Sequence, residues 1–131
     1  SSYIEFPFDN RLNRYYLNNN LLSKEYNEVL LEANRLRIDY QTFMNDAWIL
    51  KRLRSKQLYL NADNSDRNLC FFFEDFPYLG LWAIPGASFV CLEPWAGLPD
   101  CAEHNFQIIA KEGLIKIDEE REWQAKWGVQ L

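Results

Sequence analysis

The chain has 131 residues, of which 48% are hydrophobic and 25% are charged, a balance typical of a globular domain rather than a disordered segment. Fourteen basic against nineteen acidic residues give a net charge of −5, which disfavours binding to nucleic acid. The basic cluster between Lys51 and Lys56 is interpreted as a solvated strand face. No apolar run is long enough to span a bilayer, so no membrane association is expected.

Short strands separated by turns account for most of the chain. Strict alternation predicts strands at residues 3–8 and 123–131, the second being the cleanest pattern in the sequence. Further strands are expected at residues 28–31, 35–38, 47–53, 57–60, 69–73, 79–83, 89–92 and 114–117. Helical periodicity is weak, and only two single turns are predicted, at residues 23–27 and at residues 40–44 after Asp39. This pattern predicts an all-β antiparallel sandwich or barrel.

Some of these strands are apolar on both sides, for example residues 69–73, and such a strand needs cover on both faces. This predicts a partner or a further part of the same fold. The three cysteines, Cys70, Cys91 and Cys101, cannot all pair within one chain, and two of them lie in apolar runs. Reduced thiols of a cytoplasmic protein are therefore expected, in keeping with a first segment that does not resemble a signal peptide. No metal site is expected, because no second ligand pair follows Cys101 and His104 at zinc-finger spacing.

The strongest candidate for chemistry is Glu93. Alternation places it on the same strand face as Phe89 and Cys91, and Pro94 is expected to end the strand. A carboxylate that closes an apolar strand is partly desolvated, which suits a general base. The alternative is a strand-end side chain that points to water. Trp95 follows in a predicted turn, where its indole is expected at the mouth of a site.

Other candidates carry weaker signals. His104 is the only imidazole in the chain, and a role as an ordinary loop residue is favoured over catalysis. Asp46 is either a turn residue or an acceptor for sugar hydroxyls, and Asp100 is interpreted as a turn residue. No glycine-rich phosphate loop, serine elbow, zinc-binding helix or dinucleotide fingerprint is present.

Two blocks of the sequence together, Phe76-Pro77-Tyr78-Leu79-Gly80 and Glu93-Pro94-Trp95, resemble the aldose 1-epimerase (galactose mutarotase) family, on its bacterial LacX-like branch. Further matches are Asn45-Asp46-Ala47, Glu103-His104-Asn105 and Lys111-Glu112-Gly113. The resemblance extends over essentially the whole chain. It implies a galactose mutarotase-like antiparallel β-supersandwich, of which residues 1–131 would be the C-terminal part, with no separate second domain.

The resemblance also implies a reaction, the interconversion of the α and β anomers of a free aldose such as glucose or galactose, without a cofactor. In the family a glutamate takes the proton of the anomeric hydroxyl and a histidine protonates the ring oxygen. Glu93 matches the base. Asp46 matches an aspartate that holds sugar hydroxyls, although Asn45 aligns equally well. Trp95 and His104 complete the expected sugar-binding residues.

Two departures from the family pattern stand out. The family's acid histidine, with an arginine and a second histidine that bind sugar, belongs to a segment N-terminal to every residue of this chain, and His104 matches a different loop histidine. The resemblance thus implies a chain that carries the base without the acid, and that associates with the N-terminal part of the fold or with itself. In addition, Asp118-Glu119-Glu120 replaces a Pro-Gly-Glu turn. The alternatives are a non-catalytic carbohydrate-binding sandwich and an inactive fragment.

Overall fold

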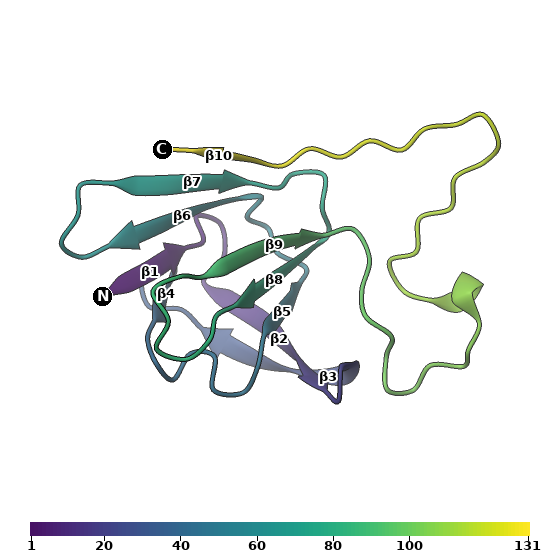
Figure 1. Ribbon diagram of the computed structural model, residues 1–131, viewed down its shortest axis with the longest axis horizontal. Helices are drawn as coiled ribbons and strands as arrows, with labels where there is room; N and C mark the ends of the chain where they lie inside the picture. Colours follow the sequence, from purple (N-terminus) through teal and green to yellow (C-terminus); the bar gives the residue numbers. More distant parts are fainter.

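The computed structural model describes residues 1–131 as two five-stranded antiparallel sheets (Figure 1), which confirms the predicted all-β class. The first sheet has the order β10-β7-β6-β1-β4, with strands β1 (Ser2–Glu5), β4 (Arg35–Ile38), β6 (Gln57–Ala62), β7 (Asn68–Phe72) and β10 (Gly128–Gln130). The second has the order β3-β2-β5-β8-β9, with strands β2 (Arg11–Asn18), β3 (Leu21–Leu30), β5 (Trp48–Lys51), β8 (Tyr78–Trp82) and β9 (Cys91–Trp95). The one helical element, a 3₁₀ turn η1 (Ile108–Ala110), is too short to cross a membrane.

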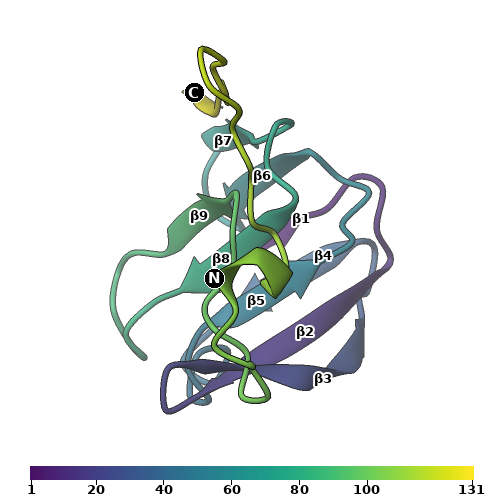
Figure 2. The same ribbon diagram turned by 90° about the vertical axis from the view of Figure 1, so that its right-hand side faces the viewer.

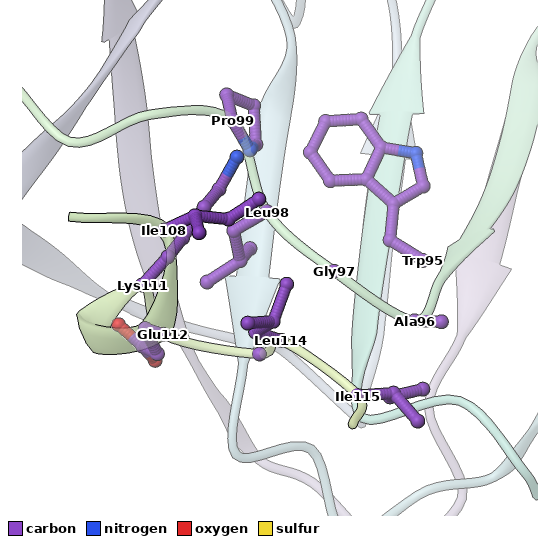
Figure 3. A pocket seen from close by; sticks show the side chains of 11 residues that line it. Trp95, Ala96, Gly97, Leu98, Pro99, Ile108, Lys111, Glu112, Leu114 and Ile115 are labelled. Carbon is purple, nitrogen blue, oxygen red and sulfur yellow. The ribbon is translucent and has the colours of Figure 1, made fainter. Parts of the chain in front are cut away.

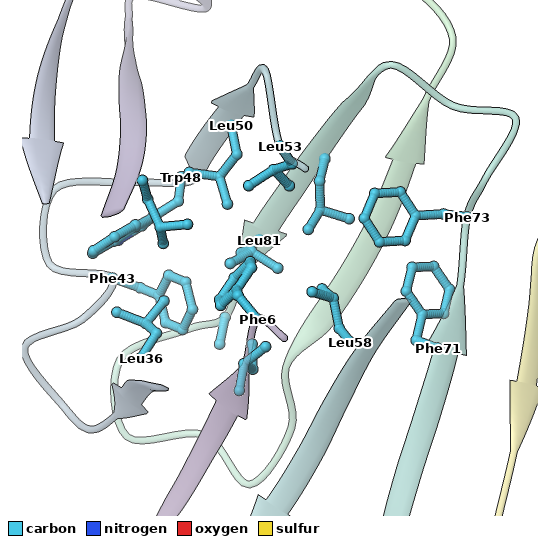
Figure 4. Packing of buried hydrophobic residues seen from close by; sticks show 14 residues of the cluster. Phe6, Leu36, Phe43, Trp48, Leu50, Leu53, Leu58, Phe71, Phe73 and Leu81 are labelled. Atoms are coloured by element: carbon cyan, nitrogen blue, oxygen red, sulfur yellow. The ribbon is translucent and has the colours of Figure 1, made fainter. Parts of the chain in front are cut away.

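The main core lies between the two sheets, because alternate side chains of each strand point inward (Figure 4). Phe71 and Phe73 stack with ring centroids 5.6 Å apart on the side of the first sheet. Ten side chains are fully buried: Phe6, Phe73, Ile4, Leu12, Ile49, Leu50, Leu58, Leu79, Leu81 and Ser55. Nine of these ten are apolar, so burial of hydrocarbon surface between the sheets is the main stabilising term.

The loop before β5 closes one end of the sandwich. The Asp39 carboxylate accepts hydrogen bonds from the backbone N–H groups of Gln41 and Thr42, at 2.9 and 3.1 Å, so the capped turn predicted at residues 40–44 is present. The indole of Trp48 donates to the Thr42 carbonyl, and the buried Arg14 guanidinium stacks on the Trp48 ring. These contacts fix the point at which β5 begins.

The prediction of a helical turn at residues 23–27 is wrong, because these residues lie in β3. They pair with β2, a strand that the sequence pattern did not reveal. Residues 11–18 are mostly polar or aromatic, and their alternation is broken where the β2–β3 register shifts between Tyr15 and Leu17. The hairpin turn itself uses Asn19 and Asn20 at φ +51° and +64°, a conformation that asparagine tolerates better than most residues.

Three strand predictions near the C-terminus are also corrected. Residues 114–117 form no strand, and only Gly128–Gln130 of the predicted strand 123–131 pairs, with β7. Alternation alone produces no strand where no neighbouring edge is available. β9 is shifted to Cys91–Trp95, so Pro94 lies inside it rather than ending it. Proline is tolerated there because β9 is the last strand of its sheet, where a missing N–H breaks no further ladder.

After β9 the chain leaves the regular sheets. Residues 96–101 cross the outer face of the second sheet and reach its far edge, where Cys101 forms a parallel bridge with Leu22 of β3 (Figure 2). Residues 102–127, the C-terminal arm, then extend away from the sandwich and return beside β7 (Figure 1). Many large apolar side chains of the arm are exposed: Phe106, Ile108, Ile109, Leu114, Ile115, Ile117, Trp123 and Trp127.

Candidate active site

The candidate site lies on the outer face of the second sheet, the face turned away from the main core. Glu93 of β9 pairs with Gly80 of β8, Gly80 pairs with Ile49 of β5, and Ile49 pairs with Tyr15 of β2. Since directly opposed residues share a face, these four form one row across the sheet. A second, smaller apolar cluster of Tyr15, Leu22, Ala47, Ile49 and Leu98 covers part of this face.

Glu93 is half-buried, and its side chain is hydrogen-bonded to Trp95, two residues further along β9. The indole Nε1–H of Trp95 donates a hydrogen bond to Glu93 Oε2 at 3.2 Å. Both side chains lie over Gly80, where an added Cβ would approach the Trp95 ring at 3.0 Å and Glu93 Oε2 at 3.3 Å. The Glu93 carboxylate thus lies on the outer face of the sheet above Gly80, and its Oε2 atom is hydrogen-bonded to Trp95.

Beside Trp95 lies a cavity of about 480 Å³ (Figure 3). One wall is the segment from Trp95 to Pro99, and the facing wall is the start of the arm from Ile108 to Ile115. Apolar side chains dominate the lining, with Lys111 and Glu112 at the polar side. Glu93 does not line this cavity, and its hydrogen bond with Trp95 is what connects the carboxylate to the aromatic wall. A flat aromatic wall of this kind can receive a ring with one apolar face.

The facing wall is held mainly by one ion pair. Lys51 Nζ lies 2.7 Å from Glu112 Oε2, and the Lys51 side chain is only 9% exposed. The ammonium also lies 4.3 Å from the centroid of the Tyr15 ring. The Tyr78 hydroxyl contacts Glu112 at 3.5 Å, and burial together with the charge of Glu112 raises the pKa of Tyr78. The interpretation of Lys51 as a solvated strand residue is therefore wrong.

Two further contacts hold the same segment. Lys111 Nζ pairs with Asp100 Oδ1 at 2.8 Å, and this hydrogen bond and charge lower the pKa of the Asp100 carboxyl. Gly113 has φ +79°, and a Cβ there would come within 2.9 Å of the Tyr78 ring. Lys111 and Glu112 thus each hold the arm by an ion pair, and Gly113 allows the arm to pass close to Tyr78.

Comparison with known proteins finds relatives in sequence and in structure. No family model matches it. It is 37% identical over 83 residues to the plasmid and chromosomal LacX proteins of Lactococcus lactis subsp. lactis, which is 63% of this chain and 28% of each LacX. A galactose mutarotase related enzyme from Lactobacillus acidophilus superposes with a TM-score of 0.82 and 25% identity over 98% of this chain. In sequence and in fold the chain is therefore similar to LacX and to galactose mutarotase-related proteins.

A second solved structure has the same fold. A galactose mutarotase-like protein from Lactobacillus casei ATCC 334 superposes with a TM-score of 0.79 and 22% identity over 98% of this chain. The chain spans 44% of each of these two structures. The predicted galactose mutarotase-like fold is therefore confirmed.

The structure brings together some predicted site residues and separates others. Glu93 and Trp95 are in contact. His104 instead lines a second cavity of about 650 Å³ together with Asp100 and Glu103, and its ring packs edge-on against Phe106 with centroids 4.3 Å apart. Neither His104 nor Glu93 is hydrogen-bonded to the other, and the roles assigned to both stay predictions.

Asp46 lies in the loop that precedes β5. It is exposed, has φ +63°, and its own carboxylate accepts the N–H of Ala47 at 2.7 Å. This is the geometry of a tight turn. Asp46 lines neither of the two cavities described above, and its role towards a sugar stays a prediction.

Four residues of the site were not identified from the sequence as functional: Gly80, Lys51, Tyr78 and Glu112. Gly80, Tyr78 and Glu112 are named in the sequence only as parts of the blocks that carry the family resemblance. A glycine in the middle of an apolar strand is a signal for a close approach by another group, and it could have indicated that something lies over β8. The Lys51–Glu112 pair joins residues 61 positions apart, and no local pattern indicates it.

Proposed function

We propose that this chain supplies the general base, Glu93, of an aldose 1-epimerase that interconverts the α and β anomers of a free aldose. The observation that carries the proposal is the half-buried Glu93 carboxylate, bonded to Trp95 on the outer face of β9 beside a cavity with an aromatic wall. Similarity to a galactose mutarotase related enzyme and to LacX supports a role of this class.

The proposed chemistry needs two proton-transfer groups. Glu93 takes the proton from the anomeric hydroxyl, an acid protonates the ring oxygen, and the bond between C1 and the ring oxygen breaks. The open-chain aldehyde rotates about C1–C2 and closes on its other face, which returns both protons and leaves the enzyme unchanged. Each group contributes about 10²–10⁴-fold to the rate. By family resemblance the acid is expected in an N-terminal segment, and no cofactor takes part.

The sugar is an aldose such as glucose or galactose. Its apolar ring face would rest on Trp95, whose indole forms one wall of the cavity (Figure 3). Asp46 and His104 are proposed to bind sugar hydroxyls, as the family resemblance implies. For His104 this requires the sugar to reach the neighbouring cavity, which shares Leu98, Pro99, Ile108, Lys111 and Glu112 with the first.

We further propose that residues 1–131 form the C-terminal part of one mutarotase-like domain and pack against its N-terminal part or against a second copy. The exposed apolar side chains of the arm support this, since contiguous exposed apolar surface marks an interaction site. The partial coverage of longer relatives supports it too. The three unpaired cysteines fit a reducing compartment such as the cytoplasm.

The test is anomer exchange, measured by NMR on glucose and galactose with the chain alone, with the chain completed by the N-terminal segment expected to carry the acid, and with Glu93→Gln in both forms. Exchange above the buffer rate that disappears in Glu93→Gln supports the proposal, and Glu74→Gln, an exposed carboxylate outside the site, is the matched control. Sugar-dependent shifts around Trp95 without exchange would instead favour a carbohydrate-binding module. Neither exchange nor binding would identify an inactive fragment.

A further inference from the structure

We infer that Trp95 and Gly80 are positioning residues for Glu93, in addition to any contact that Trp95 makes with a sugar. This inference rests on the proposed role of Glu93 as the base. Together the two residues hold the carboxylate and leave one of its oxygens available for the proton. Gly80 lies on β8 at the position directly opposite Glu93.

Trp95 holds the Glu93 carboxylate through a hydrogen bond. An indole N–H is a donor only, so Trp95 can hold Glu93 Oε2 but cannot take part in proton transfer. A hydrogen bond to a charged carboxylate is stronger than one between neutral groups, and Glu93 is half-buried, which reduces competition from water. The other oxygen, Oε1, accepts no hydrogen bond from the protein. The geometry therefore assigns proton acceptance to Oε1.

Gly80 provides the space that the side chains of Trp95 and Glu93 occupy above β8. A Cβ at this position would lie 3.0 and 3.1 Å from two atoms of the Trp95 ring and 3.3 Å from Glu93 Oε2. Its backbone is not in the left-handed region, unlike that of Gly86 and Gly113, so conformational freedom does not explain the glycine. A glycine inside a strand weakens that strand. Close approach of both bonded partners to β8 accounts for it.

The strands that carry these three residues form a rigid support. Glu93, Trp95 and Gly80 all lie on paired strands, Gly80 is buried, and Trp95 packs against the apolar cluster that contains Ile49. A functional group held on strands is placed more accurately than one on a loop. Displacement of the base by about 1 Å can cost about 10²-fold in rate. Removal of either support is therefore expected to act on the chemical step.

The experiment uses the full chain labelled with ¹⁵N and compares the indole N–H resonances of wild type, Trp95→Phe, Gly80→Ala and Glu93→Gln. Trp95→Phe identifies the Trp95 resonance by its loss. Glu93→Gln and Gly80→Ala are each expected to move that resonance, while the indole of Trp48, which donates to Thr42, stays in place. A Trp95 resonance that is unchanged in both variants overturns the inference.

A second readout is kinetic. Trp95→Phe keeps an aromatic wall but loses the donor, so it is expected to lower kcat for anomer exchange about 10²-fold with KM changed less than two-fold. Trp82→Phe is the matched control, because Trp82 lies on the same face of β8 without a hydrogen bond to Glu93. A raised KM with unchanged kcat in Trp95→Phe overturns the positioning role and leaves only a platform.

The two failures can be told apart. Absence of exchange when the chain is combined with the N-terminal segment expected to carry the acid contradicts the proposed function, whereas the indole resonances still decide whether Trp95 and Gly80 hold the carboxylate. Conversely, exchange that requires Glu93 but is indifferent to Trp95→Phe and Gly80→Ala keeps the proposed function and overturns the positioning role. The melting temperature of each variant is recorded, so that a folding defect is not mistaken for a displaced base.

Discussion

Phe73 in the sandwich has no exposed surface, whereas Phe106 in the C-terminal arm is 88% exposed. The same contrast separates the two walls of the candidate site. Glu93 and Trp95 stand on paired strands, while the facing wall, from Ile108 to Ile115, contains no strand and is held by a few polar contacts. The proposed base therefore stands on a rigid support. The cavity wall that faces Trp95, in contrast, is held by individual side chains.

The largest expected effect is in the sandwich core. Phe73→Ala removes a fully buried ring and is expected to lower the free energy of unfolding by about 3–5 kcal/mol. Phe106→Ala, at the exposed arm position, is expected to change it by less than about 0.5 kcal/mol. Urea denaturation of both variants beside the wild type measures the difference. Similar losses in the two variants would mean that Phe106 is covered in solution, by a second copy or by other chain segments.

The second prediction concerns the ion pair that holds the arm. Glu112→Gln leaves the nearly buried Lys51 ammonium without its carboxylate, and a loss of about 1–3 kcal/mol is expected because one partner is buried and the other is partly exposed. Glu103→Gln is the matched control, since its pair with Lys24 is exposed on both sides and is expected to contribute less than about 0.5 kcal/mol. Equal effects in denaturation would show that Lys51 is solvated after all.

The smallest expected effect depends on pH. Lys111 lowers the pKa of Asp100, so the folded state favours the ionised carboxylate. The stability from this pair is therefore present above the usual aspartate pKa of 3.8 and is lost as pH falls through the lowered value. The protection of the amides of residues 108–115, measured as hydrogen exchange relative to the intrinsic rate at each pH, is expected to fall in that acid range in the wild type. In Asp100→Asn the same amides should already exchange faster at neutral pH, and an identical acid profile in both proteins would contradict the assignment.

The sandwich could be predicted in part from sequence because its strands are short apolar runs bounded by turns. Residues 35–38 and 57–60 were located in this way, and they form β4 and most of β6. The strand β2 was missed because polar and aromatic residues face outward along it, and because its alternation is broken by a register shift. The alternating residues 123–127 formed no strand, since a period-two pattern gives the faces of a strand but supplies no partner.

Some features of the candidate site could likewise be predicted from the sequence, and others could not. Alternation predicted that Glu93 shares a face with Cys91, and their positions two residues apart in β9 agree with this. Contacts between distant segments, such as Lys51 with Glu112 and Gly80 with the Trp95 ring, follow only from the folded arrangement. Lys51 in particular resembled a solvated residue because a lysine is buried only when a partner compensates its charge, and that partner is 61 residues away.

The most direct test is the ratio of galactose anomer-exchange rates between the wild-type chain and Glu93→Gln, each completed by the N-terminal segment expected to carry the acid and each corrected for the buffer rate. A base on the reaction path predicts a fall of at least about 10²-fold in Glu93→Gln, with Glu74→Gln equal to the wild type. Catalysed exchange at the same rate in the wild type and in Glu93→Gln would contradict the central claim that Glu93 is the base.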